Sequence, residues 1–241
     1  MRGRCVLVTE VAHFVSFATA SAFADAGAVV GVVERDEPAV SAAADKITRE
    51  GGTCLAYVAD PSSASQARQC LATFIADVGR LDVLYNGPDP ASCLPSQYQT
   101  TSGKTHRRLH SHRQLVRTIA AALPVMLQRA SGSLINVTVV LSPSQWGRQT
   151  TWMTTHPTLR LTSALAEEYS TRGITCNAIV LGVTAPFESR QSVTVAPHLT
   201  TLSDSDPGSP AIGDAEEAAA AAALFLGSAG GGLDDRCITD R

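Results

Sequence analysis

The chain has 241 residues, of which 44% are hydrophobic and 17% charged, and its formal net charge is −3. This composition supplies the core of one large domain, and it excludes the strongly basic balance of proteins that bind nucleic acid or membrane surfaces. Six cysteines without a C-x-x-C pair favour reduced thiols over disulfides or a zinc site. An apolar strand begins by Cys5, leaving no room for a signal peptide, and no apolar run approaches the ~20 residues that span a membrane. We therefore expect a soluble, cytoplasmic protein.

Short apolar runs alternate with helical patterns along the chain. Strands are expected at residues 5–9, 29–34, 53–60, 81–86, 133–141, 175–182 and near 236–240, and helices at 18–28, 39–52, 63–79, 104–130, 158–173 and 214–228. Strands that alternate with helices at short spacing are typical of a parallel sheet with helices on both faces. The pattern predicts an α/β fold, a single Rossmann-like doubly wound domain over residues 1–241 with about seven strands. Residues 185–213 contain four prolines and are expected to form a long surface excursion.

The order of these elements, together with the stretches LDVLYNG, AALPVML, INVT, RGITCNAIVLG and EEAAAAAALFLGS, resembles the short-chain dehydrogenase/reductase family over essentially the whole chain. Members of that family bind NAD or NADP at a glycine-rich turn. They use a Tyr-x-x-x-Lys pair, helped by a Ser and an Asn, to move a proton while hydride passes to or from nicotinamide. The resemblance therefore implies positions at which a nucleotide and catalytic groups would lie.

The glycine-rich turn of that family falls at Glu10, Phe14 and Ser16, in the stretch VTEVAHFVS. Glycine serves such a turn because the backbone must close tightly and approach the pyrophosphate without a Cβ in the way. Phe14 would place a ring where phosphate should lie, and Glu10 adds negative charge. We therefore expect that this chain binds no dinucleotide, and that Glu34 and Asp60, at the family's ribose and adenine positions, are relics.

The family's Asn-Asn-Ala-Gly stretch becomes Asn86, Gly87, Pro88 and Asp89. A strand end followed by a proline-containing turn is the simpler interpretation of these residues, because Gly, Pro and Asp are common turn residues. We therefore expect a rebuilt turn at Asn86 and no new site.

The family's catalytic positions are altered as well. Its tyrosine falls at Trp152, its lysine at His156, its serine at Val139 and its asparagine at Ser111. An indole N–H donates a hydrogen bond but does not titrate, so Trp152 cannot replace a phenol as acid or base. No tyrosine in the chain is followed four residues later by Lys or Arg. The sequence therefore predicts no catalytic residue at these positions and no intrinsic hydride-transfer activity.

Two residues near the altered positions could substitute for the family's catalytic groups. Thr138 would reach the old serine position only if the strand slipped by one residue, because side chains alternate along a strand. His156 could act as an acid, a base or a ligand, but Pro157 suits a first helical turn, so His156 is better interpreted as a helix-start residue. No second ligand lies at helical spacing from His156, so no metal site is expected.

Residues 103–113, GKTHRRLHSHR, concentrate lysine, arginine and histidine without an acid. A solvated helix start explains this stretch, and capture of an acidic partner surface or of a phosphate-bearing ligand such as coenzyme A is the alternative. The stretch lacks the interleaved aromatic residues that stack on bases, so nucleic acid is a poor candidate.

Two functions from different classes remain. The first is a catalytically inactive subunit, which supports an active paralogous dehydrogenase in a heterodimer or heterotetramer. NAD or NADP would then be bound by the partner, and an acyl-CoA-type hydroxy or keto compound would be the substrate. The second is a non-redox enzyme, because VTEVAHF resembles the start of halohydrin dehalogenases. Those enzymes keep a Ser, a Tyr and an Arg where this chain has Val139, Trp152 and His156.

Overall fold

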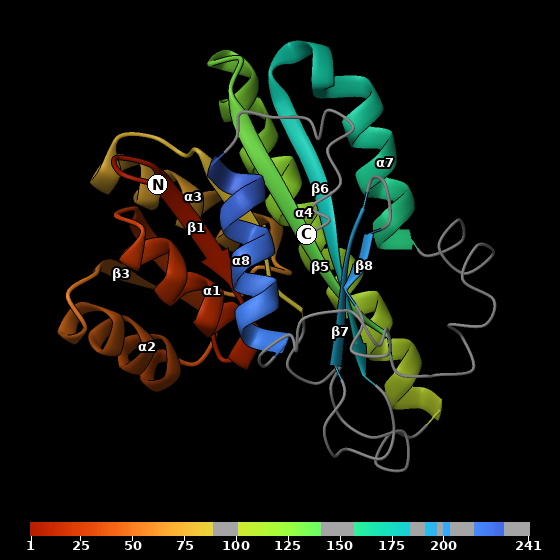
Figure 1. The fold of residues 1–241 in the computed structure, drawn as a ribbon, viewed down its shortest axis with the longest axis horizontal. Helices are drawn as coiled ribbons and strands as arrows, with labels where there is room; N and C mark the ends of the chain where they lie inside the picture. The colour runs from red at the N-terminus through yellow and green to blue at the C-terminus, as the bar shows by residue number, and fades with distance from the viewer. Residues whose placement is uncertain (89–100, 141–156, 184–190, 197–199, 203–214, 229–241) are drawn as a thin grey trace.

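The structure is a computed structural model, and it describes residues 1–88, 101–140, 157–183, 191–196, 200–202 and 215–228. Eight strands are present in the described part of the chain: β1 Cys5–Thr9, β2 Val29–Glu34, β3 Thr53–Val58, β4 Val83–Asn86, β5 Gly132–Val140, β6 Ile174–Val183, β7 Gln191–Ala196 and β8 Thr200–Leu202. The α-helices are α1 Phe14–Asp25, α2 Glu37–Arg49, α3 Ala64–Val78, α4 Thr101–Gln128, α7 Pro157–Tyr169 and α8 Ala215–Ser228 (Figure 1).

One sheet contains all of these strands, in the order β3-β2-β1-β4-β5-β6-β7-β8. Strands β1 to β6 are parallel, and the strand order reverses between β1 and β4. Leu7 and its neighbours in β1 pair with β2 on one side and with β4 on the other. This arrangement confirms the predicted Rossmann-like doubly wound fold. In parallel sheets of this kind, ligands bind beyond the carboxyl ends of the strands at the point of reversal.

The expected surface excursion at residues 185–213 contains β7 and β8, two strands that the sequence analysis did not predict. β7 pairs antiparallel with β6, and β8 pairs antiparallel with β7, so the two strands extend the sheet at one edge. The alternating pattern of QSVTVA fits a strand, but the prolines and serines around it resemble a loop. The strand expected near 236–240 lies outside the described residues.

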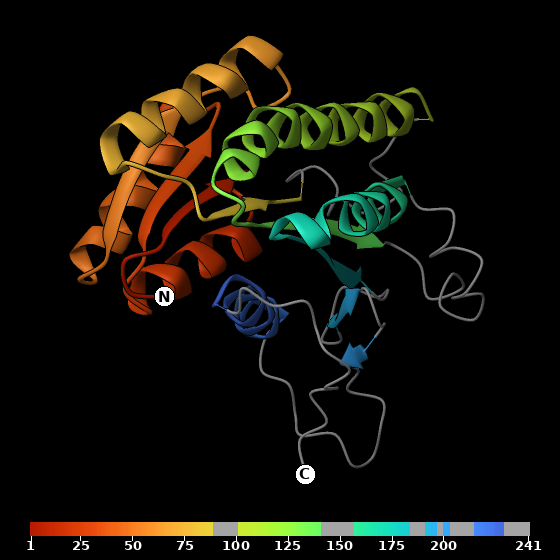
Figure 2. The same cartoon turned by 90° about the horizontal axis from the view of Figure 1, so that it is seen from above.

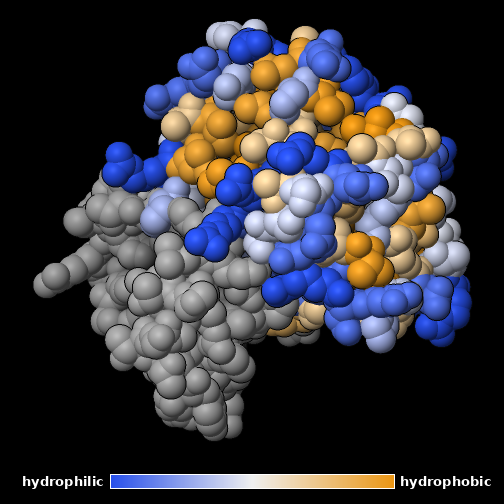
Figure 3. All heavy atoms as spheres, turned by 180° about the vertical axis from the view of Figure 1, so that it is seen from behind, coloured by the Kyte–Doolittle hydropathy of each residue, from blue (hydrophilic) through white to orange (hydrophobic). Residues whose placement is uncertain are grey.

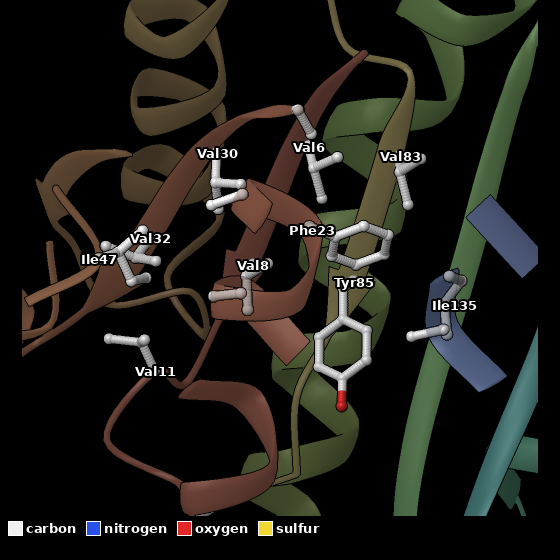
Figure 4. Close-up of a cluster of buried hydrophobic side chains, with 14 of the residues drawn as sticks. Val6, Val8, Val11, Phe23, Val30, Val32, Ile47, Val83, Tyr85 and Ile135 are labelled. Atoms are coloured by element: carbon white, nitrogen blue, oxygen red, sulfur yellow. The ribbon is translucent and has the colours of Figure 1, made fainter. Parts of the chain in front are cut away.

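The helices form one layer on each face of the sheet. Figure 2 shows α3, α4 and α7 on one side and α1, α2 and α8 on the other. Side chains alternate along β1, so Val6 and Val8 join the core under α1 and α8, whereas Leu7 joins the core under α3 and α4. Figure 4 shows the first of these cores, where Phe23 of α1 packs among the strand valines and Tyr85.

The buried carboxylate of Asp82 joins the amino ends of β1 and β4. Asp82, just before β4, accepts hydrogen bonds at 2.8 Å from the Cys5 backbone N–H and from Arg80 Nε, and Arg129 approaches its second oxygen at 3.5 Å. These contacts fix the start of β1 against the start of β4.

Within the described residues, no helix has the length and apolar character needed to cross a membrane.

Candidate functional site

The turn between β1 and α1 lies at the point where the strand order reverses. Glu10 has φ = 55°, and its side chain is 1% exposed. A positive φ is the left-handed conformation that favours glycine and costs another L-residue about 1–2 kcal/mol. The backbone at this position therefore has a conformation that favours glycine, while a buried carboxylate occupies it.

The N-terminus of α1 is capped by His13. The Val15 N–H donates to His13 Nδ1 at 3.2 Å, and the His13 ring, 3% exposed, stacks on Phe14 with centroids 4.5 Å apart. Because Nδ1 accepts this hydrogen bond, the neutral ring carries its proton on Nε2. The imidazole thus uses a backbone N–H of the kind that binds phosphate at a helix N-terminus.

This geometry adds to one expectation and corrects another. The sequence predicts an obstruction at Phe14, whose ring is 40% exposed, and the side chain that bonds the helix N-terminus is that of its neighbour His13. The helix also begins at Phe14, four residues before the expected start at residue 18. A histidine directly before the first helical residue was the available signal, but His is an uncommon cap beside Ser, Thr, Asp and Asn.

Glu34 ends β2 and contacts the same turn. Its Oε2 accepts from the Ala12 N–H at 3.3 Å and its Oε1 from the Arg35 N–H at 2.9 Å. The side chain is buried. The carboxylate expected as a relic of ribose binding is therefore bonded to the backbone of the turn.

Asp60 follows β3 and has a local structural role. Its Oδ1 accepts from the Ser62 N–H at 2.9 Å and from the Ser62 hydroxyl at 2.7 Å. An aspartate that bonds the backbone two residues further on stabilises a turn. This oxygen holds the chain at the start of α3.

Ser16 and Gly87 fill the same small volume. Ser16 stands at the family's third glycine position on α1 and is buried, and Gly87 directly follows β4. A Cβ on Gly87 would overlap the Ser16 hydroxyl and the Thr9 carbonyl oxygen. The change to serine on one side is thus matched by glycine, in place of the family's asparagine, on the other.

Buried polar side chains lie where the last residue of β4 pairs with β5. Asn86 Nδ2 donates to Asn136 Oδ1 at 2.9 Å, the Thr118 hydroxyl donates to Asn86 Oδ1 at 2.6 Å, and Asn136 Nδ2 donates to Thr162 Oγ1 at 2.9 Å. This chain of hydrogen bonds connects α4, β4, β5 and α7. Asn86 therefore lies in a satisfied structural network.

A second buried contact lies beside this network. Gln114 of α4 donates from Nε2 to Thr9 Oγ1 at 3.3 Å, and the Gly87 N–H donates to the same oxygen at 3.2 Å. The contact fixes α4 against the end of β1 and against the turn at Gly87.

A small cavity lies between the strand ends and helices α3 and α4. Its volume is about 20 Å³, and Val33, Ala59 and Pro61 are among its lining residues. That volume holds about one water molecule. This cavity, which borders the family's adenine position, is too small for a purine ring.

The catalytic positions are only partly described. Ser111 lies within α4 and Val139 within β5, and their side chains fall outside the described set. Trp152 and His156 lie outside the described residues. Helix α7 begins at Pro157, as the sequence predicted.

Most of the basic stretch 103–113 lies in α4 with undescribed side chains, and Arg113 at its end is exposed. In the described ranges, no group of three or more His, Cys, Asp or Glu could hold a metal ion.

The strand order of the parallel sheet reverses beside β1, and the β1–α1 turn lies at that point. These two features define a Rossmann-type architecture. The chain belongs to the short-chain dehydrogenase/reductase family, since a family model described as enoyl-(acyl carrier protein) reductase matches residues 11–233. Solved structures share the fold: a metagenomic short-chain oxidoreductase in complex with NADP superposes with a TM-score of 0.62 at 20% identity, over 95% of this chain and 91% of that one. NAD⁺-bound xylitol dehydrogenase gives 0.62 at 19% identity, over 77% and 72%.

Curated relatives match shorter parts of the chain. A short chain dehydrogenase of Pseudocercospora fijiensis is 28% identical over 144 residues, which is 59% of this chain and 47% of that protein, so the match spans about half of that relative. The 2,5-dichloro-2,5-cyclohexadiene-1,4-diol dehydrogenase LinX of Sphingobium indicum is 25% identical over 185 residues, 76% of this chain and 73% of that protein. Both relatives are named as dehydrogenases.

Proposed function

We propose that this chain is a catalytically inactive short-chain dehydrogenase/reductase-type subunit, which supports an active paralogous dehydrogenase in a hetero-oligomeric oxidoreductase. One observation carries the proposal: side chains of the chain itself bond the backbone N–H groups of the phosphate turn. His13 takes the N–H of Val15, and Glu34 takes the N–H of Ala12.

A dinucleotide would have to displace these contacts to use the turn. Its pyrophosphate would also meet Glu10 and Glu34, two buried glutamates on this side of the cleft. Removing the hydrogen-bond partner of a buried group costs about 1–3 kcal/mol, and like charges in a buried site repel strongly. The residues present do not fit a dinucleotide, so NAD or NADP belongs to the partner in this proposal.

The surface available for assembly lies on α4 and α7. Val116 of α4 is 45% exposed, Leu123 of the same helix is half-buried, and Leu161 and Leu165 of α7 are half-buried beside them. Figure 3, which views the side of the sheet that carries α3, α4 and α7, shows hydrophobic side chains gathered on this side. An apolar face of two long helices suits packing against equivalent helices of another chain.

The proposed substrate of the assembly is an acyl-CoA-type hydroxy or keto compound. Such a compound is anionic, and residues 103–113 supply lysine and arginine that would attract it. The same stretch would equally attract an acidic surface on the partner. Binding of free coenzyme A to the isolated chain distinguishes these two roles.

The second candidate is a non-redox enzyme of the halohydrin dehalogenase kind. The observation that favours it is the turn itself, where Glu10, His13 and Phe14 close the nucleotide position without unfolding the turn. Turnover of a halohydrin or a related substrate by the isolated chain, without nicotinamide, would establish this candidate in place of the first.

Co-expression tests the subunit proposal. Each family member encoded beside this chain is co-expressed with it, and the tagged chain is purified. We expect one paralogue to co-purify in a mixed oligomer with an interface above ~2,000 Å². That paralogue should lose stability or activity when expressed alone, because its folded state is favoured by its mate. Full activity and stability of every paralogue alone, with no mixed species, would contradict the proposal.

A further inference from the structure

We propose that Asn86, which directly precedes Gly87, is a site of covalent modification that only the unfolded chain exposes, and that a chain modified there does not regain the native fold. The modification is deamidation, in which the side-chain amide of asparagine becomes a carboxylate. The inference goes beyond the proposed function, and it does not depend on whether the nucleotide position is closed.

Deamidation begins when the backbone nitrogen of the residue after an asparagine attacks the side-chain carbonyl carbon, Cγ. This nitrogen loses its proton and forms a bond to Cγ, and the bond from Cγ to Nδ2 breaks, so that ammonia leaves. Water then opens the resulting succinimide ring at either of its two carbonyl carbons. The products are aspartate and isoaspartate, whose main chain runs through the side-chain carboxyl carbon. The net change consumes one water and releases one ammonia, and it needs no oxidant or reductant.

The sequence makes Asn86 the most susceptible of the three asparagines in the chain. Asn86 is followed by glycine, Asn136 by valine and Asn177 by alanine. Glycine has no Cβ to shield its nitrogen, and its backbone reaches the conformation of the ring at little cost. A branched side chain such as that of valine is stiff and hinders the attack. We therefore expect Asn86 to react first in an unfolded chain.

The folded chain blocks this reaction. Asn86 ends β4 and pairs with Asn136 of β5, so its backbone is extended, and ring closure requires it to rotate out of the strand conformation. The attacking nitrogen is that of Gly87, whose N–H donates to Thr9 Oγ1 at 3.2 Å. Both ends of the Asn86 amide are bonded as well, Nδ2 to Asn136 and Oδ1 to Thr118. Attack on Cγ therefore requires the end of β4 to open.

The packing of the fold requires glycine at position 87. A Cβ on Gly87 would overlap the Ser16 hydroxyl and the Thr9 carbonyl oxygen, and the second of these belongs to the backbone. Any other residue at this position would therefore displace α1 or the end of β1. The folded state thus depends on the residue that makes Asn86 labile in the unfolded state.

Aspartate at position 86 would disrupt the buried network. Its carboxylate has no donor to replace Nδ2, so it would meet the Asn136 Oδ1 acceptor across a contact of 2.9 Å. Turning the Asn136 amide around would not restore a hydrogen bond, because its Nδ2 donates to Thr162 Oγ1, whose own proton goes to the Thr158 carbonyl oxygen. A buried charge without a partner is strongly destabilising.

Isoaspartate at position 86 would fit no better. It adds one carbon atom to the main chain directly before Gly87, which is itself buried. The added atom would move the Gly87 N–H away from Thr9 Oγ1 or move Gly87 toward the Ser16 hydroxyl. Both products therefore favour the unfolded state, so each deamidation removes one molecule from the folded population.

Deamidation rates of the full chain test the first part of the inference. The chain is incubated at mildly alkaline pH in isotopically labelled water, both in buffer and in urea above its unfolding midpoint, and peptide mapping follows all three asparagines. In urea, Asn86 should react at least about tenfold faster than Asn136 or Asn177. In buffer, Asn86 should react at least about a hundredfold more slowly than in urea, because the strand end must first open.

Gly87→Ala is the matched control for the attacking nitrogen. It is measured in urea only, because the folded chain has no room for its Cβ, and it should slow the reaction at Asn86 alone. Equal rates at the three asparagines in urea would overturn the inference. So would equal rates at Asn86 in buffer and in urea, or a rate in urea that Gly87→Ala leaves unchanged.

Refolding tests the second part. A partly deamidated sample is diluted out of urea, the folded fraction is isolated by size exclusion, and its content of modified position 86 is measured. We expect this content to be at least about tenfold lower than in the starting sample, because a buried unpaired charge opposes folding. Asn86→Asp, which makes one product directly, should have a lower urea midpoint than the wild type or fail to fold.

Gln69→Glu, an exposed substitution on α3, adds the same charge and should have the midpoint of the wild type. Modified chains as abundant in the folded fraction as in the starting sample would refute the second part, as would a midpoint for Asn86→Asp equal to that of Gln69→Glu. None of these outcomes bears on nucleotide binding or on capture of a paralogue, so failure of the proposed function is detected separately.

Discussion

Asn86 and Asn136 face each other at the paired ends of β4 and β5, and the Nδ2 group of Asn86 donates to Oδ1 of Asn136 at 2.9 Å. Both side chains are buried, and threonines of α4 and α7 complete their hydrogen bonds. These buried polar residues therefore bond one another, and they connect α4 and α7 to the sheet.

Substitution Asn86→Ala should lower the free energy of unfolding by about 2 kcal/mol, because it leaves the buried Oδ1 of Asn136 without its donor. Urea denaturation followed by circular dichroism measures the change. Gln69→Ala, an exposed substitution on α3, is the control and should shift the midpoint little. A loss for Asn86→Ala no larger than that control would show that the network contributes nothing to stability.

The isolated chain should bind NAD⁺, NADH, NADP⁺ and NADPH with dissociation constants above ~100 μM, which corresponds to less than about 5.5 kcal/mol of binding free energy. The physical reason is that His13 and Glu34 already bond the turn and that Glu10 adds a buried carboxylate. Calorimetric titration measures this, with an active paralogue as the positive control. Tight binding of any of the four would refute our interpretation of the turn.

Removing the cap of α1 should destabilise the fold. His13→Ala is expected to cost about 1 kcal/mol, the usual loss when an N-cap side chain disappears, whereas His13→Asn should retain most of the stability because asparagine caps well. Thermal unfolding of the two variants beside the wild type decides this. Equal melting temperatures for His13→Ala and His13→Asn would show that the imidazole contact is unimportant.

Restoring the family's catalytic residues should not restore reduction. The triple variant Trp152→Tyr, His156→Lys and Val139→Ser still has the closed phosphate turn, so no nicotinamide would be positioned. The absorbance of reduced nicotinamide with carbonyl substrates measures the activity, and the active paralogue is assayed in parallel. Hydride transfer by this variant would mean that a nucleotide reaches the cleft despite His13.

Two buried cysteines, Cys70 and Cys176, and the half-buried Cys54 should be unreactive in the folded chain. Desolvation raises the pKa of Cys54 to about 12, of Cys70 to about 11 and of Cys176 to about 12. At neutral pH fewer than about one in 10⁴ of these thiols is then a thiolate, the form that reacts. Peptide mapping after iodoacetamide treatment should find these three labelled only after denaturation. Rapid native labelling of any one of them would contradict the packing described here.

The same thiols give stability a definite pH dependence. An unfolded thiol ionises near pH 8.5, whereas the folded ones ionise only at higher pH, so unfolding is favoured once the unfolded thiols lose protons. Their contribution is fully present below the unfolded pKa and is lost as the pH rises through the folded values. Urea midpoints measured on the alkaline side should fall with pH, and serine at the three positions should flatten the fall.

Local patterns account for most of the sheet and few of the contacts at the turn. The strands β1 to β6 were predictable because each is a short apolar run between turn residues, and the start of α7 followed from the fixed φ of Pro157. The strands β7 and β8 were missed because their neighbouring prolines resemble a loop. The pairing of β7 with β6 is a long-range contact, and no local sequence pattern predicts it.

The contacts at the turn were harder to predict for a related reason. Glu34 and Ala12 are far apart in the chain, and their hydrogen bond exists only after β1 and β2 are paired. A single histidine contributes to no helical or strand periodicity. The sequence therefore could not distinguish a buried His13 that accepts from the Val15 N–H from a histidine on the surface. The missing glycines showed that the site had changed, and the structure shows which groups took their place.

The shared volume of Ser16 and Gly87 has an evolutionary consequence. Returning glycine to position 16 alone would leave a void against Gly87, and returning asparagine to position 87 alone would collide with the serine hydroxyl. Asparagine at position 87 would also meet the Thr9 carbonyl oxygen, which belongs to the backbone, so even the double reversion requires the end of β1 to shift. Positions 16 and 87 are therefore coupled by epistasis to each other and to the backbone at Thr9, and a lineage that carries Ser16 and Gly87 cannot return to the family's pattern one substitution at a time without loss of stability.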